Sequence, residues 1–459
     1  MNSVRTKHVF LEVEQMSENI LGTEKISKLF IKFSIPAIIS MVIAGAQIII
    51  DGIFLGNFVG QNALASVNIV QPFMQVIIGF SMIISVGSLS FIGRSLGEGK
   101  KEEAQNIFKT AFVCITIISL VIVLVGRLFS VEIAVLLGAN EVLLEGVSIY
   151  TRTISIFAPL MCLMFLFGFT NRVVGKPELY LRGMILSLIV NISLDFILIK
   201  QLNLGIRGAA FATGIAYVAA FFVGARPMLI KKNIVNIFSG KFDKSVIIPM
   251  VYNGSSEAVI AIAIAITAYL FNITFMKIAG EAGVAAFATI NYISQFGILI
   301  MFGISDGIGP ILSYNYGNKK HERLNNTLKL ASKVNLIVGL ILFFILFVFG
   351  EQLVSLFASG KEEVLNLAVG GARIYAFSFL VCGFNIINSG YFTAIGDARS
   401  SIIIAASRGI VFIILGINIL PLIIGINGVW LTVPLAESMT FIIGMYLVKN
   451  NNNLCVEVA

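Results

Sequence analysis

Twelve apolar runs of about 20 residues or more follow one another along the 459-residue chain, and no other feature constrains its fold as strongly. A helix rises 1.5 Å per residue, so about 20 residues cross the roughly 30 Å hydrocarbon core of a bilayer. The predicted spans are residues 32–56, 63–92, 108–130, 150–172, 180–200, 208–230, 246–277, 283–314, 328–350, 368–395, 400–420 and 426–448. We therefore expect an all-α integral membrane protein with twelve transmembrane helices.

The composition excludes several other classes of protein. Hydrophobic residues make up 58% of the chain and charged residues only 12%, about half the charged share of a soluble domain. The two histidines and four cysteines are scattered without the spacing of a metal or haem site, so we predict no cofactor. The chain also lacks an HExxH motif and a phosphate-binding loop with its Ser or Thr, which argues against an enzyme and against an ATP-driven pump.

The basic residues indicate how the chain is oriented. With the N-terminus in the cytoplasm, 25 of the 32 Lys and Arg residues fall in cytoplasmic segments and 7 in outside loops. This bias follows the positive-inside rule and predicts that both termini are cytoplasmic. The net charge of +8 is therefore interpreted as topology and contact with membrane lipids, and no nucleic-acid partner is expected.

Short motifs recur in the two halves of the chain. The ten residues 60–69 reappear 223 residues later as 283–292 with four identities, and Gly205-Ile-Arg-Gly208 reappears 220 residues later as Gly425-Ile-Asn-Gly428. Because six spans return the chain to the same side, the two six-helix bundles would be parallel, pseudo-symmetric repeats. We predict an N-lobe over residues 1–230, a cytoplasmic linker over 231–245 and a C-lobe over 246–459.

Five acidic residues lie inside predicted spans, where a charge is costly and usually functional: Asp51, Asp195, Glu257, Asp306 and Glu437. Asn191 and Asp195 are four residues apart and so share one helical face, and Gln47 lies one turn before Asp51. Such oxygen ligands suit Na+ or a proton, although a buried hydrogen-bond cluster is the alternative. Glu257 could serve a substrate path or packing, and we expect Arg408 to snorkel to the inner interface.

The chain resembles the multidrug and toxic compound extrusion (MATE) family of cation-coupled exporters. The resemblance rests on Pro36, Asp51-Gly-Ile-Phe-Leu-Gly56, residues 63–68, residues 191–195, residues 205–213 and Ser313-Tyr-Asn-Tyr-Gly317. It implies two six-helix lobes and an N-lobe cation site formed by Asp51, Asn191, Asp195 and Thr213. Residues 253–257 and 314–317 favour the bacterial multidrug branch, in which the acid of the seventh helix would be Glu257. The tenth span has Asn385 and Asn388 where some relatives carry an acid, which weakens any C-lobe cation site.

These features lead to the hypothesis of a monomeric Na+- or H+-coupled antiporter in a bacterial cytoplasmic membrane. It would export small organic cations by alternating access, with Pro36 as a hinge in the first span. The predicted substrate path includes Gln47, Asn68, Glu257 and Asn291. The alternative is a flippase for a lipid-linked saccharide precursor, which would need a strongly cationic cavity, and Arg408 is the one candidate for it.

Overall fold

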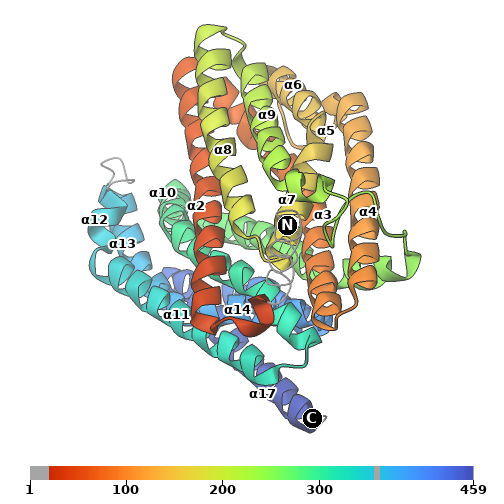
Figure 1. Ribbon diagram of the computed structural model, residues 1–459. Helices are drawn as coiled ribbons and strands as arrows, with labels where there is room; N and C mark the ends of the chain where they lie inside the picture. The colour runs from red at the N-terminus through yellow and green to blue at the C-terminus, as the bar shows by residue number, and fades with distance from the viewer. Residues whose placement is uncertain (1–19, 356–361, 458–459) are drawn as a thin grey trace. The chain divides into compact units, whose positions relative to one another are not determined.

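The computed structural model describes residues 20–355 and 362–457, and every regular element in these two ranges is a helix (Figure 1). A bilayer offers no hydrogen bonds to the backbone, so an apolar chain satisfies its amides within helices. The first half contains α2 (Ile26–Phe58), α3 (Gln61–Gly97), α4 (Lys101–Leu128), α5 (Ser130–Leu136), α6 (Glu141–Ser155), α7 (Ala158–Val173), α8 (Glu178–Leu194), the π-helical turn η1 (Asp195–Gln201), α9 (Gly205–Ala225) and the 3-10 turn η2 (Arg226–Leu229). The predicted all-α membrane fold is confirmed.

The second half has a similar order of elements. It contains the 3-10 turn η3 (Lys244–Val246), α10 (Ile247–Gly317), α11 (His321–Val348), α12 (Gly350–Ser355), α13 (Glu362–Ala376), α14 (Phe379–Ile395), α15 (Ala398–Ala406), the π-helical turn η4 (Ser407–Val411), α16 (Phe412–Ile424) and α17 (Ile426–Glu457). The pairs α6/α7 and α13/α14 are each bent by 54°. The fourth and tenth predicted spans are therefore broken in the same way.

The number of spans follows from these bounds. Within the described ranges, nine helices are long and apolar enough to cross a membrane, and the two bent pairs raise the number to eleven. Helix α10 is 71 residues long, but its backbone leaves the helical region at Gly280, with φ 59° and ψ −151°. Dividing α10 at this residue gives the twelve spans that the sequence predicts.

Left-handed backbone residues support the duplication independently of sequence identity. Gly60 and Gly280 both have positive φ, and so do Gly205 and Gly425. A third pair with positive φ is Gly99 and Lys319, and in all three pairs the second residue follows the first after 220 residues. Residues with side chains rarely adopt positive φ. The recurrence of three such turns at one offset therefore indicates that the two halves arose by duplication.

The contacts between residues divide the chain into two units. Unit 1 contains the described residues up to Gly254 together with Ser313–Lys320, and unit 2 contains Ser255–Leu312 and the described residues from His321 onward. In unit 1, the rings of Phe112 and Phe167 stack in the core. In unit 2, Trp430 packs against Phe275 with ring centroids 4.5 Å apart. The lobe boundaries at 230 and 246 stay a prediction.

The predicted linker, residues 231–245, belongs to unit 1 and is hydrogen-bonded to the first turns of α4. The Gln105 side chain donates to the carbonyl of Asn236 (2.7 Å) and accepts from the amide of the same residue (2.8 Å). The ammonium of Lys109 donates to the carbonyl of Ile237 (2.8 Å). These bonds satisfy backbone groups that irregular chain would otherwise leave unpaired.

Helix α3 packs closely against both ends of α10 within unit 1. A Cβ atom added to Gly87 would collide with the carbonyl oxygen of Met250, and one added to Gly93 with the hydroxyl of Ser313. Gly79 has open space beside it. Small residues let helices approach closely where lipid provides no hydrophobic drive for association. The glycines at 87 and 93 are therefore packing positions, whereas Gly79 is not.

Candidate functional site

The four residues of the predicted N-lobe cation site come together in unit 1. Helix α8 packs along α9 and α2, and Figure 1 shows these three helices side by side. Asp51 lies in α2 and Thr213 in α9, and the Thr213 hydroxyl donates to Asp51 Oδ2 over 3.2 Å. The side chains of Asn191, near the end of α8, and Asp195 adjoin Asp51. Helices α2, α8 and α9 and the turn η1 thus place two carboxylates, an amide and a hydroxyl side by side.

Several polar atoms of this site are buried without a partner. Asn191 and Asp195 are fully buried, and Thr213 is 5% exposed. Within the described ranges, Asp51 Oδ1, both carboxylate oxygens of Asp195 and both amide atoms of Asn191 lack a hydrogen-bond partner. A buried, unpaired carboxylate is costly, and native proteins rarely leave such groups unsatisfied. The donor set therefore suits a bound cation or a shared proton, which would satisfy these oxygens.

The backbone changes from α-helix to π-helix at this site. Helix α8 ends at Leu194, and Asp195 is the first residue of the π-helical turn η1. Such turns are rare and occur frequently at functional sites, where they change the direction in which side chains point. Periodicity in the sequence did not predict this turn.

A small cavity of about 90 Å³ is lined by Asp51 but not by Asp195. Of the residues predicted for the coupling site and the substrate path, Asp51, Thr213, Gln47 and Asn68 line it. A water molecule occupies about 30 Å³ in the liquid, whereas pockets for drug-sized ligands measure about 300 Å³ or more. The cavity has room for an ion with a few waters and is too small for a drug-sized compound.

Four further polar residues line the cavity that sequence reasoning missed: Gln71, Gln75, Tyr150 and Tyr217. A signal for two of them was present in the second span. Asn68, Gln71 and Gln75 are three and four residues apart, so they form a polar stripe on one face of an otherwise apolar helix. Nothing comparable marked Tyr150 or Tyr217, whose partners come from other helices.

Pro36 lies inside α2, which continues unbroken from Ile26 to Phe58. Its carbonyl oxygen accepts a hydrogen bond from the hydroxyl of Ser40 over 2.7 Å. Proline lacks the amide that would bond one turn back, so the helix is weakest there. The hinge role of Pro36 stays a prediction.

In unit 2, the remaining membrane acids have different surroundings. Glu257 is half-buried and lies near Asp306, whereas Asn291 is exposed. Glu437 accepts from the guanidinium of Arg408 at 2.7 and 3.1 Å, and from the amide of Asn385 at 2.7 Å. Snorkelling of Arg408 to the inner interface was therefore a wrong expectation. Arg408 turns inward because Glu437 offers it a buried counter-charge.

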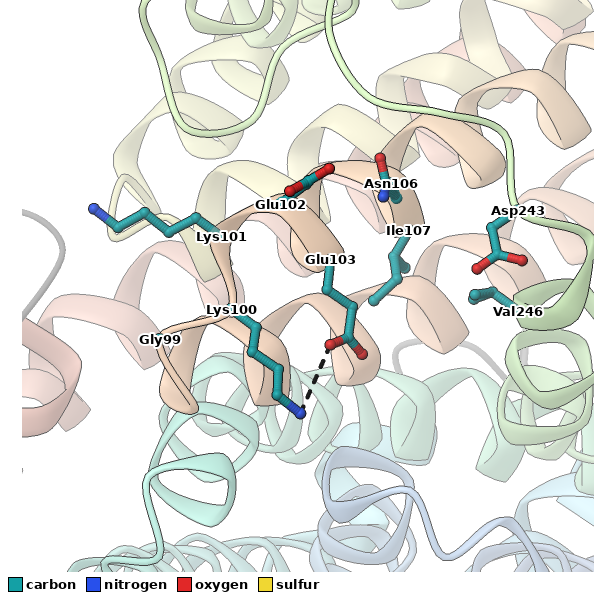
Figure 2. Close-up of a pocket in the computed structure, with 9 residues that line it drawn as sticks. All are labelled: Gly99, Lys100, Lys101, Glu102, Glu103, Asn106, Ile107, Asp243 and Val246. Carbon is teal, nitrogen blue, oxygen red and sulfur yellow. Dashed lines mark ion pairs between the residues drawn. The ribbon is translucent and has the colours of Figure 1, made fainter.

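A larger cavity of about 550 Å³ lies at the turn between α3 and α4, beside the linker (Figure 2). Figure 2 shows Lys100 and Glu103 turned toward each other, with 3.8 Å between charged atoms. Lys100 also pairs with Glu98 at 2.6 Å, which raises the pKa of Lys100. Exposed charges that already have partners are typical of a solvated loop, so this cavity is not our candidate site.

Comparison with known proteins identifies one family in both halves of the chain. The MatE family model matches residues 36–197 and 258–417, one stretch in each half. The Multidrug export protein MepA of Staphylococcus aureus (strain bovine RF122 / ET3-1) is 26% identical over 429 residues, covering 92% of this chain and 93% of that protein. MepA of Staphylococcus haemolyticus (strain JCSC1435) is 25% identical over 437 residues, covering 95% and 96% of the two chains.

Solved structures share the fold. A MATE crystal structure in the bent conformation superposes with a TM-score of 0.90 at 22% identity, covering 96% of this chain and 98% of the other. A MOP superfamily transporter from Pyrococcus furiosus gives a TM-score of 0.88 at 22% identity, covering 96% and 98%. At this level of identity the likeness establishes the architecture of the helices alone.

Proposed function

Because the chain belongs to the MatE family, we propose that it is a multidrug exporter that exchanges small organic cations for Na+ or H+. The observation that carries this proposal is the group of buried, unpaired oxygens on Asp51, Asn191 and Asp195. Similarity to MepA multidrug export proteins over more than nine-tenths of the chain supports the class of substrate. The protein would act as a monomer in a bacterial cytoplasmic membrane, with both termini in the cytoplasm.

Competition for negative charge would couple the two fluxes. Two adjoining carboxylates can neutralise one cation well, but they cannot neutralise a coupling ion and a cationic substrate together. Entry of Na+ or H+ at Asp51 and Asp195 would therefore lower the affinity for substrate and favour its release. The two lobes would alternate between inward-facing and outward-facing states, with α2 bending at Pro36.

The coupling ion is either Na+ or a proton. Carboxylate, amide and hydroxyl oxygens are ligands for Na+, and a pair of buried carboxylates can equally share a proton. Thr213 already donates to one oxygen of Asp51, which leaves its second oxygen for the ion.

A flippase for a lipid-linked saccharide precursor is not favoured. Pyrophosphate would require a cationic cavity, and the residues that line the 90 Å³ cavity include one carboxylate and no Lys or Arg. Arg408, which the flippase hypothesis needed, is paired with Glu437.

Transport by reconstituted protein tests the proposal. Proteoliposomes loaded with a fluorescent organic cation would receive a Na+ gradient or a pH gradient separately, and one of them should drive efflux. Asp51→Asn and Asp195→Asn should abolish this response. Glu98→Gln, at an exposed cytoplasmic acid, provides the matched control and should transport as the parent does. Efflux by both aspartate variants at the parent rate would refute the assigned site.

A further inference from the structure

Both oxygens of the Glu437 carboxylate in α17 are hydrogen-bonded by side chains of its own unit. Arg408 directs both Nε (3.1 Å) and Nη2 (2.7 Å) to Oε1 of Glu437. The side-chain amide of Asn385 in α14 donates to Oε2 of Glu437 over 2.7 Å and to the backbone carbonyl of Glu437 over 2.8 Å. Both oxygens therefore have donors, and a guanidinium already supplies the counter-charge.

The pair is well removed from water. The side chain of Arg408 is 16% exposed and that of Glu437 is 7% exposed. Arg408 lies in the π-helical turn η4, just as Asp195 lies in the π-helical turn η1 of unit 1. Each unit therefore has a π-helical turn that carries an intramembrane charge beside a buried carboxylate. The sign of that charge differs between them.

A buried carboxylate needs a counter-charge, and the two units meet this need differently. In unit 1 three of the four carboxylate oxygens of Asp51 and Asp195 are unpaired, so a cation from outside the chain can bind and leave. In unit 2 the cation is part of the chain. The guanidinium is always charged and matches the planar carboxylate, so it cannot dissociate as an ion does.

We infer that Arg408 is a tethered counter-ion that permanently fills a cation site at Glu437 and Asn385 in unit 2. Unit 2 then holds a cation that is fixed to the chain, whereas the cation site of unit 1 is exchangeable. This inference rests on the proposed function and deepens it, because it removes Glu437 from the candidate sites for the exchangeable coupling ion. Arg408 is a positioning residue in this account, since it touches no substrate.

Removing the tether should convert the occupied site into an open one. In Arg408→Ala, Glu437 and Asn385 remain, and added guanidinium should bind between them. The experiment measures the thermal midpoint of purified full-length protein in nanodiscs during a low-millimolar titration with guanidinium chloride, with KCl at equal ionic strength as the blank. The parent and the double variant Arg408→Ala/Glu437→Gln are the controls.

Mass action predicts the outcome, because a ligand that binds only folded protein raises its thermal midpoint in proportion to the logarithm of concentration. The midpoint of Arg408→Ala should rise by several degrees with guanidinium, while the parent and the double variant should show no rise. A flat titration of Arg408→Ala, or an equal rise in the double variant, would overturn the inference. If Arg408 only filled space, added guanidinium would not change the thermal midpoint of Arg408→Ala.

If Arg408→Ala does not accumulate as folded protein, a second comparison decides the matter. Glu437→Gln leaves a buried guanidinium without its counter-charge, and the double variant removes both charges. A tethered counter-ion predicts a higher yield of folded double variant than of Glu437→Gln. Equal or lower yield of the double variant would contradict the tether.

Counting bound coupling ions separates this inference from the proposed function. If Na+ titrations of the parent give one site per chain, Arg408→Ala should give two, and adding Asp51→Asn and Asp195→Asn should remove one of them. A parent that binds no coupling ion would count against the proposed function. The guanidinium titration would still decide the role of Arg408, because it requires no transport.

Discussion

The two units keep the same chain path but treat their membrane charges in opposite ways. In unit 1, Asp51 and Asp195 adjoin each other, and three of their four carboxylate oxygens have no hydrogen-bond partner in the described structure. In unit 2, Glu437 is bonded by Arg408 and Asn385 through both oxygens. One carboxylate site is left for a mobile ion, and the other is closed by the chain.

The difference shows which features a duplicated transporter retains. The 54° bends of the fourth and tenth spans and the turns with positive φ at Gly205 and Gly425 recur in both units. The charged residues are free to diverge as long as each buried carboxylate has a counter-charge. Scaffold variants should therefore behave alike in both units, whereas charge variants should not.

The largest expected effect is a difference in free energy of unfolding between two single variants, one with a neutralised carboxylate in unit 1 and one in unit 2. Glu437→Gln leaves Arg408 buried without its partner, and breaking such a pair costs about 3–5 kcal/mol in free energy of unfolding. Asp195→Asn removes a charge that has no partner, so it should leave the free energy of unfolding unchanged or raise it. Denaturation of both variants beside the parent in the same nanodiscs measures the contrast. Equal losses would show that the two sites are equivalent.

A second contrast concerns the neutral hydrogen-bond donors. Thr213→Val removes the donor to Asp51, and a bond to a charged group contributes about 1.5–3 kcal/mol. This bond stabilises the ion-free carboxylate, so its loss should strengthen binding of a coupling proton. Since 1.4 kcal/mol corresponds to a factor of ten, half-maximal proton-driven efflux should require about tenfold less of the ion.

Asn385→Leu is the matched change in unit 2. It removes the donor to Glu437 and should lower the thermal midpoint without changing the dependence of efflux on the coupling ion. The two titrations of efflux rate against ion concentration should therefore separate the units. An equal shift in Asn385→Leu would place a coupling ion in unit 2.

The third prediction tests the shared scaffold. Gly205 and Gly425 have φ of 55° and 59°, and Gly425 has ψ of −138°; backbone with positive φ costs a residue with a side chain about 1–3 kcal/mol. Gly205→Ala and Gly425→Ala should lower the free energy of unfolding by similar amounts of that size. Alanine at Gly370, which has open space around it and lies in a helix, serves as the control and should be neutral or slightly stabilising. Unequal losses at the two turns would contradict equivalent packing.

The sequence predicted most of the fold because the signals are local. Apolar length identifies a span, and the polar and basic segments between spans indicate topology without knowledge of any contact. Gly280 and Gly425 show the limit of this reasoning, because a glycine in an apolar run does not reveal whether its φ is positive. Pro159 signals a kink close to the bend at residues 156–157, whereas no proline marks the bend at 377–378.

The site was only partly predictable. Asp195 and Asn191 share a helical face, so their proximity follows from spacing, but Asp51 and Thr213 are 162 residues apart and were joined through the family resemblance. Arg408 and Glu437, 29 residues apart on different helices, were considered one at a time. Sequence gives the cost of each buried charge, but only packing shows which charges neutralise each other.

The smallest expected effect on stability comes from Asn68 and Asn291, which occupy equivalent positions in the repeated segments 60–69 and 283–292. Both side chains are exposed, so alanine at either position should change the free energy of unfolding by less than about 0.5 kcal/mol. Asn68 lines the cavity beside Asp51, whereas Asn291 belongs to unit 2 and lines no part of it. Asn68→Ala should therefore change the coupling-ion concentration that gives half-maximal efflux, and Asn291→Ala should leave it as in the parent. The measurement is efflux from the same proteoliposomes over a graded series of ion concentrations. A shift in Asn291→Ala alone would place the coupling site in unit 2 and reverse the contrast between an open first unit and a closed second one.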